Sequence, residues 1–165
     1  MKYEFRKGIS TDEARLQKLG LISYGVFENV LTEENWRKLK SDLEAEKLYK
    51  ELLTVSTCFV CERSKEIIGM AFLIPTRNPT DIFQADWSYI RMVGVHPNFT
   101  GQGIGKKLIQ LCIDHAKANN EHTVALHTSE FMNAARHIYE ALGFKQQKEL
   151  TPRLGKRYWL YKLDL

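Results

Sequence analysis

The chain has 165 residues, of which 44% are hydrophobic and 27% are charged, and its formal net charge at pH 7 is +4. We expect one domain over residues 1–165, because a single core typically serves about 100–150 residues, and the composition excludes a disordered chain. No apolar run approaches the roughly 20 residues of a membrane span, and the amino terminus lacks a signal-peptide pattern. We therefore expect a soluble, cytoplasmic protein.

The first third of the chain predicts a strand followed by two helices. Tyr3–Gly8 has the composition of a strand. Ser10 and Glu13 then form the pattern of a capping box, which predicts a helix towards Tyr24. Thr32 is placed to cap a second helix. Apolar residues of that helix recur at helical spacing: Trp36, Leu39 and Leu43.

The centre of the chain changes to the pattern of strands. Thr54–Arg63 and Ile67–Pro75 predict a hairpin that turns at Ser64–Glu66. After a loop over Thr76–Gln84, Asp86–Val95 predicts a third central strand. Simple alternation places Ile90 and Met92 on one face of that strand and the following residues on the other: Trp87, Tyr89, Arg91, Val93 and Val95.

Cys58 and Cys61 form a C-x-x-C pattern within a predicted strand. Strand residues three apart point to opposite faces, so we expect neither a disulfide nor a shared metal ion. Together with Cys112 they are predicted to be buried thiols.

The last third alternates helices and strands. Residues 106–120 predict a helix, Thr123–Thr128 a strand, and Asn133 the N-cap of a helix that ends at Gly143. Two final strands follow, at Phe144–Glu149 and Lys156–Leu163. The complete order of elements predicts a mixed sheet with helices on both faces.

The most informative segment is VGVHPNFTGQGIGKK, at Val93–Lys107. An apolar strand leads through three alternate glycines into a helix, whose first amides and positive dipole end suit a phosphate. The segment is not a P-loop, because its Gly-Lys pair is followed by Lys107. It is not a dinucleotide fingerprint either, because Lys106 stands where the third glycine is required. A glycine-rich turn that only packs a helix on a sheet is the alternative.

Two segments together resemble the GNAT superfamily of N-acetyltransferases. TGQGIG at Thr100–Gly105 matches that family's pyrophosphate motif, Q/R-x-x-G-x-G/A, except for Thr at the first position. About thirty residues later, NAARHIYEALGF is similar to its N-x-x-A-x-x-x-Y-x-x-x-G-F helix in Asn133, Tyr139, Gly143 and Phe144, with Asn133 one position closer to Tyr139 than in the pattern. The resemblance implies an α/β (α+β) fold: a mixed, mostly antiparallel sheet of about seven strands, splayed between its two central parallel strands, with helices on both faces.

The resemblance also implies acetyl-CoA (coenzyme A) as co-substrate, with no metal ion. Backbone groups of one strand would pair with the pantetheine arm, amides of the glycine-rich loop would hold the pyrophosphate, and Asn133 would reach the arm from the other side. Tyr139 would lie beside the thioester sulfur as the catalytic residue and donate a proton or a hydrogen bond to it. The implied cofactor-binding residues are Val93, Val95, Thr100, Gly101, Gln102, Gly103, Ile104, Gly105, Lys106, Asn133 and Tyr139.

The general base stays open. Where the histone-modifying branch of the family has a glutamate, this chain has Tyr89. The candidates are Asp86, Glu28, His127 and Glu130, or a chain of water molecules. We expect direct attack of an amine on the thioester in a ternary complex.

The acceptor is predicted to be a small-molecule or protein amine, bound near Tyr24–Lys50, Thr76–Asp86 and Lys148–Arg157. Aromatic residues there could form a cleft or simply pack in the core: Tyr24, Phe27, Trp36, Phe83, Trp87 and Tyr89. The resemblance allows a homodimer. A catalytically inactive acyl-CoA sensor or interaction module is the alternative function. A basic edge at Lys145–Lys162 suits an anion, but no motif predicts nucleic acid or membrane as a partner.

Overall fold

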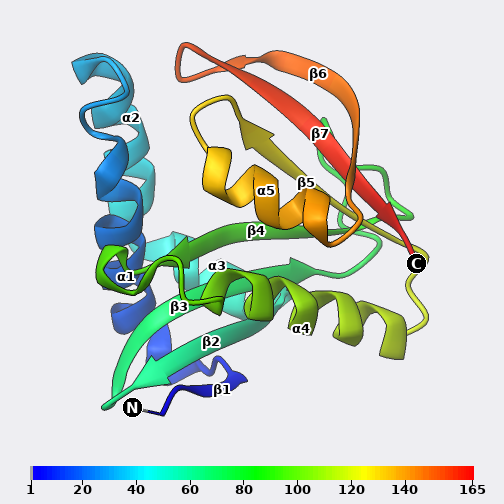
Figure 1. The fold of residues 1–165 in the computed structure, drawn as a ribbon, viewed down its shortest axis with the longest axis horizontal. Coiled ribbons are helices and arrows are strands. Elements are labelled where there is room, and N and C mark those ends of the chain that lie inside the picture. Colours follow the sequence, from blue (N-terminus) through cyan, green and yellow to red (C-terminus); the bar gives the residue numbers. More distant parts are fainter. Residues whose placement is uncertain (1) are drawn as a thin grey trace.

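The computed structural model describes residues 2–165, and its centre is a seven-stranded sheet in the order β1-β2-β3-β4-β5-β7-β6 (Figure 1). Neighbouring strands run antiparallel, except for the parallel pair β4 and β5. This mixed sheet confirms the predicted fold class. The strands are β1 (Glu4–Lys7), β2 (Thr57–Arg63), β3 (Glu66–Ile74), β4 (Ser88–Val95), β5 (Thr123–Ser129), β6 (Lys145–Arg153) and β7 (Lys156–Asp164).

Helices cover both faces of the sheet, as Figure 1 shows. One face carries α1 (Glu13–Tyr24), with α2 (Glu33–Glu44) packed on it, and α3 (Glu46–Val55). The other face carries α4 (Ile104–Ala118) and α5 (Asn133–Ala141). No helix within residues 2–165 is long and apolar enough to cross a membrane. Short 3-10 helices lie at Ser10–Asp12, Gly25–Phe27 and Pro97–Phe99.

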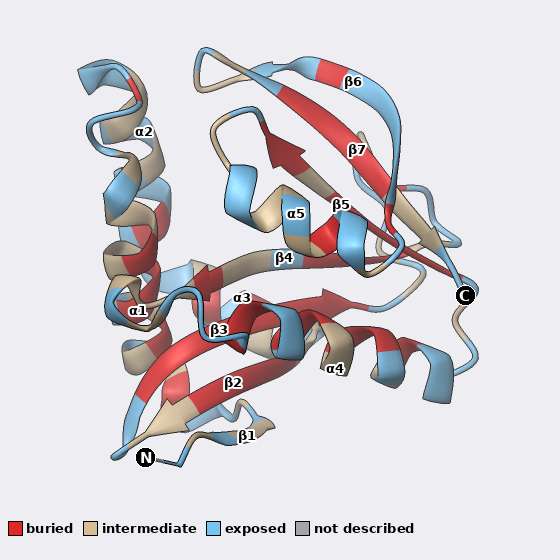
Figure 2. Ribbon diagram, in the orientation of Figure 1, coloured by how far each residue is buried: buried red, intermediate tan, exposed pale blue. Residues whose placement is uncertain are grey.

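The sheet separates two apolar clusters, because strand side chains alternate between its faces. The α4-side core is centred on Leu108, Ile109 and Cys112. The α1-side core is centred on Leu16, Leu19 and Phe72. Figure 2 shows the central strands buried along most of their length and the outer turns of the helices exposed.

The parallel strands β4 and β5 pair at one end only. Ser88 lies opposite Val124 and Tyr89 opposite Ala125, and beyond these two pairs the strands separate. The hydroxyl of Ser88 donates a hydrogen bond of 2.9 Å to the carbonyl of Thr123, which ties the closed end. We call the diverging region the splay.

A β-bulge at Met92 changes the phase of β4. Gly94 pairs with Met70 and Arg91 with Phe72, so a single residue of β3 lies opposite two of β4. Met92 has a φ of 54°, in the left-handed region. Beyond it, Val93 and Val95 pack against the α4-side core, whereas Met92 packs against the α1-side core. The predicted alternation, which placed Arg91 on one face with Val93 and Val95, is therefore wrong.

The amino-terminal half contains two further differences from the prediction. The helix α1 is preceded by a turn whose cap is Asp12: its carboxylate accepts the Ile9 amide at 2.9 Å, and neither Ser10 nor Glu13 forms the predicted box. The helix α3 occupies Glu46–Val55, where only the end of α2 and the start of a strand were expected, and it buries Tyr49 and Leu52.

Several local predictions are confirmed. The Thr32 hydroxyl accepts the Asn35 amide at 3.2 Å, as a cap of α2 should. Ser64 and Lys65 turn the β2–β3 hairpin with φ angles of 50° and 66°. The thiols of Cys58 and Cys61 are free and buried, in the α1-side and α4-side cores respectively.

Candidate functional site

The glycine-rich loop between β4 and α4 presents a row of unpaired amides. Gly101 and Gly103 have φ angles of 75° and 82°, which favour glycine, and a Cβ at either would meet no atom within 4 Å. The amides of residues 101–106 donate to no other residue of 2–165, and Gly103, the N-cap of α4, provides no side-chain cap. Because the helix dipole adds positive potential, this is a suitable seat for a diphosphate.

Exposed side chains of the loop form hydrogen bonds within the protein. The Thr100 hydroxyl donates to the Pro97 carbonyl at 3.1 Å, and the side-chain oxygen of Gln102 accepts a hydrogen bond from the Tyr3 hydroxyl. Ile104 is buried, and a Cβ on Gly105 would lie 3.3 Å from Ile138 of α5. Anion binding here would therefore use the main chain, with the exposed Lys106 at its edge.

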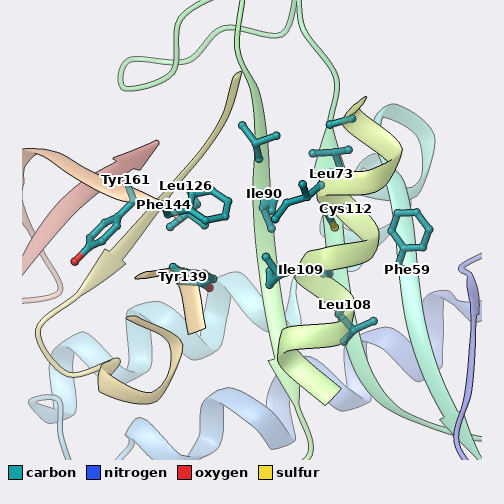
Figure 3. Close-up of a cluster of buried hydrophobic side chains, with 14 of the residues drawn as sticks. Phe59, Leu73, Ile90, Leu108, Ile109, Cys112, Leu126, Tyr139, Phe144 and Tyr161 are labelled. Carbon is teal, nitrogen blue, oxygen red and sulfur yellow. The ribbon is translucent and has the colours of Figure 1, made fainter. Parts of the chain in front are cut away.

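The α5 side of the splay carries Tyr139. Its side chain is 6% exposed, and its ring centroid lies 5.9 Å from that of Phe144. Figure 3 shows it with Phe144 on one side and Ile109 of α4 on the other. Burial raises the pKa of Tyr139, so the phenol stays protonated at neutral pH.

Asn133 does not cap α5 as predicted. It is the first residue of the helix, is exposed, and its side chain makes no cap hydrogen bond; Met132 occupies the cap position. Its side-chain oxygen instead accepts from Arg136 at 3.5 Å. The non-helical backbone of an N-cap is found at Met132, one residue earlier than predicted. A single asparagine in the sequence marks the start of a helix only to within a residue or two. Gly143, with a φ of 99°, forms the predicted left-handed end.

The four candidate bases occupy different places. Glu28, Asp86 and Glu130 are exposed, and Asp86 precedes the closed end of the splay. His127 is half-buried in β5, two residues beyond the last pair of the splay. Its ring lies 5.7 Å from that of Tyr158, and burial, with the charges of Arg153 and Arg91, lowers its pKa to about 4.

Aromatic rings form a connected row on the α1 side of the splay. The ring centroids of Tyr24 and Phe27 are 5.9 Å apart, and those of Phe27 and Phe131 are 4.8 Å apart. The ring centroids of Phe131 and Tyr158 are 6.3 Å apart. The Tyr24 hydroxyl donates to the Val93 carbonyl at 3.3 Å, so the row reaches the strand next to the bulge. Phe131 and Tyr158 were not predicted among the aromatic residues of the site. Only the pairing of β5 with β7 brings these two residues next to each other.

The four other predicted aromatics lie outside this row. Phe83 and Tyr89 stack at 4.3 Å on the α1-side core, and Trp87 lies against Lys162, whose ammonium is 5.5 Å from the ring. Trp36, on α2, is only half-buried.

A mixed sheet that splays beside a helix with free amino-terminal amides defines a protein built to hold an extended, phosphate-bearing ligand. The model of the Acetyltransferase (GNAT) family matches residues 26–144 of this chain. The chain belongs to the GNAT acetyltransferase family.

Similar proteins carry the same fold and include named acyltransferases. The chain is 30% identical over 125 residues to a probable N-acetyltransferase, camello, of Xenopus tropicalis, covering 74% of this chain and 54% of the relative. It is 31% identical over 70 residues to the L-amino acid N-acyltransferase MnaT of Escherichia coli, covering 41% and 40%. The chain thus spans about half the length of the curated relatives it matches.

Among solved structures, the PaiA N-acetyltransferase of Thermoplasma acidophilum, in complex with coenzyme A, superposes with a TM-score of 0.78. The two chains are 17% identical, and the match covers 100% of each.

Proposed function

We propose that this protein is an acetyl-CoA-dependent N-acetyltransferase that moves the acetyl group to a primary amine by direct attack in a ternary complex. The observation that carries the proposal is the row of unpaired amides at residues 101–106, at the start of α4 and beyond the end of β4 that is not paired with β5. Family membership supports acetyl transfer in general.

The chain supplies a seat for each part of the co-substrate. The amides of residues 101–106 bind the diphosphate, and the open space over Gly101 and Gly103 leaves room for it. The main chain at Val93 and Val95 pairs with the pantetheine arm along the splay, and Asn133 binds that arm from α5.

The amine nitrogen attacks the thioester carbonyl, so that a C–N bond forms and the C–S bond breaks. A backbone amide near Val93 stabilises the oxyanion of the intermediate. The Tyr139 hydroxyl donates a hydrogen bond to the leaving thiolate, and its raised pKa keeps the phenol protonated while the sulfur takes up a proton from solvent. The proton of the amine leaves through a base or a water chain.

The cysteines support direct transfer rather than an acetyl-enzyme. Burial raises the pKa of Cys58 to about 12 and of Cys61 to about 11, and it also raises the pKa of Cys112. The nucleophilic form of a cysteine is the thiolate, which these three side chains do not form at neutral pH.

Isothermal titration calorimetry with acetyl-CoA tests the seat. Gly103→Glu places a carboxylate among the amides and should abolish micromolar binding. Gly25→Glu is the matched control, since a Cβ at Gly25 also meets no atom within 4 Å but lies at the end of α1. Equal binding by both variants, with thermal unfolding showing both to be folded, would overturn the proposed seat.

Turnover then separates an enzyme from an acyl-CoA sensor. A panel of primary amines should release coenzyme A, and Tyr139→Phe should lower kcat by about 100-fold or more while leaving acetyl-CoA affinity unchanged. Tight acetyl-CoA binding without turnover of any amine would favour the sensor.

A further inference from the structure

Two basic residues stand at the same level on either side of the splay: Arg91 of β4 and His127 of β5. Each lies two residues beyond the last paired residues of its strand, Tyr89 and Ala125. They are the only basic residues within β3, β4 and β5. A basic residue in the middle of apolar strands is uncommon, and here two occur at one level of the sheet.

Both side chains point to the α1 side. Arg91 lies directly opposite Phe72 on β3, and His127 lies opposite Leu160 on β7. Because paired residues share a face and Phe72 and Leu160 belong to the α1-side core, Arg91 and His127 share that face too. The glycine-rich loop and Tyr139, by contrast, adjoin the α4-side core.

The charge of Arg91 is uncompensated. Its side chain is exposed and forms no hydrogen bond or ion pair with any residue of 2–165. Asp81, the acidic group that acts on His127, is already paired with Arg153, at 3.9 Å. Burial chiefly sets the pKa values of His127 and Tyr24, and in both the charge of Arg91 acts to lower the value, so its guanidinium lies near both groups.

His127 offers an unused acceptor beside that charge. Its Nδ1 is buried and has no hydrogen-bond partner among the described residues. Because burial, Arg153 and Arg91 all lower its pKa, against Asp81 alone, the ring is neutral at pH 7 and one nitrogen carries a free lone pair. Phe83 and Tyr158 pack near the ring, at centroid distances of 6.1 Å and 5.7 Å, and neither contact satisfies that nitrogen.

Building on the proposed function, we infer that the acceptor is a primary amine with a carboxylate on the neighbouring carbon, as in a free α-amino acid. Arg91 binds the carboxylate, and Nδ1 of His127 accepts a hydrogen bond from the amine. The carboxylate supplies the missing counter-charge, and the amine supplies the missing donor. The two arginine charges also disfavour an ammonium, and so favour the free amine that attacks the thioester.

An amine without a carboxylate would meet the positive charge of Arg91 with nothing to offset it. The same holds for the first residue of a peptide, whose carbonyl is an amide. The arrangement therefore selects free amino acids over amides and simple amines.

The test compares kcat/KM for amino acids and for their amides, over glycine, alanine, methionine, phenylalanine and glutamate. Within each pair, the carboxylate of the amino acid is replaced by an amide. The amine of the amide is less basic, so more of it is unprotonated and reactive, and this difference works against the expected preference for the amino acid. The wild type should prefer the best amino acid over its amide by about 10- to 100-fold. Arg91→Gln should bring that ratio close to one, and Arg91→Lys should retain part of it.

Lys117→Gln is the control, because it also removes one exposed positive charge, in the last turn of α4 on the other face of the sheet, and it should leave the ratio unchanged. A preference for amides, or an unaltered ratio in Arg91→Gln, would overturn the inference while leaving the proposed acetyl transfer in place. If no amine is acetylated, N-acetylamino acids are titrated into the complex of the protein with coenzyme A, and binding is measured by calorimetry. Failure to bind any N-acetylamino acid would overturn the inference as well.

Discussion

Gly69 of β3 links the packing of the sheet to the glycine-rich loop, and Gly69→Ala tests that link. A Cβ at this position would lie 2.7 Å from Cγ2 of Ile104, 3.0 Å from Cδ1 of Leu108 and 3.3 Å from Cβ of Cys61. The leucine methyl is the end of a flexible side chain and can move. The Ile104 methyl is bonded to Cβ, and β-branched side chains are stiff in helices, so the first turn of α4 must shift.

The size of the effect follows from two opposing contributions. Overpacking a core typically costs roughly 1–3 kcal/mol, and replacing glycine by alanine within a strand returns roughly 0.5–1 kcal/mol. The net loss should be about 1–2 kcal/mol, or about 2–8 °C in Tm for a chain of this length. Because Ile104 is the first residue of α4, the same shift should move the amides of the loop and weaken acetyl-CoA binding.

Thermal unfolding and calorimetry measure the two effects separately. Gly8→Ala is the control: its Cβ would lie equally close, 2.7 Å, to Sγ of Cys58, but far from the loop in the sheet. It should lower Tm and leave the affinity for acetyl-CoA unchanged. Adding Ile104→Leu, which removes Cγ2, should restore part of both losses in Gly69→Ala, with a coupling of at least roughly 0.5 kcal/mol. Loss of stability in Gly69→Ala with unaltered affinity would refute the reasoning.

Two further predictions concern stability. Tyr49→Phe should stabilise the protein by about 1–2 kcal/mol in urea unfolding, because the Tyr49 hydroxyl is buried and has no hydrogen-bond partner among residues 2–165; a loss of stability would show that the hydroxyl is satisfied. The hydrogen bond from Arg6 holds the pKa of buried Asp12 below its usual value. Asp12 therefore stabilises the fold above about pH 4 and loses this contribution as pH falls through its folded pKa. Asp12→Asn should cost about 3 kcal/mol at pH 7 and flatten the acid dependence of Tm, which wild type and variant scans from pH 7 to pH 3 measure.

The sequence was sufficient to predict the strands in their order along the chain, because hydrophobic alternation and turn residues such as Ser64 and Lys65 are local signals. The break between α2 and α3 at Ala45 was missed, since no proline or glycine marks it and the charged residues on either side favour helix equally. The cap at Asp12 was missed because its carboxylate is fixed by Arg6, from a different element.

The candidate site was predicted in the same uneven way. The glycine-rich loop has a sequence signature, and in the structure its amides are unpaired at the start of α4. The facing positions of Arg91 and His127 depend on the β4–β5 register, which joins segments more than thirty residues apart, and on a bulge at a methionine. No residue preference marks Met92 for a left-handed backbone.

The extra residue at Met92 has a consequence for how two reactants can meet. Before the bulge, the side chain of Arg91 lies on the α1 side of the sheet. After the bulge, the side chains of Val93 and Val95 lie on the α4 side. A single strand thus presents two different surfaces within a few residues. In the proposed reaction the donor and the acceptor approach from opposite sides of the sheet and come together at the opening between β4 and β5, so neither has to pass the other to enter or leave.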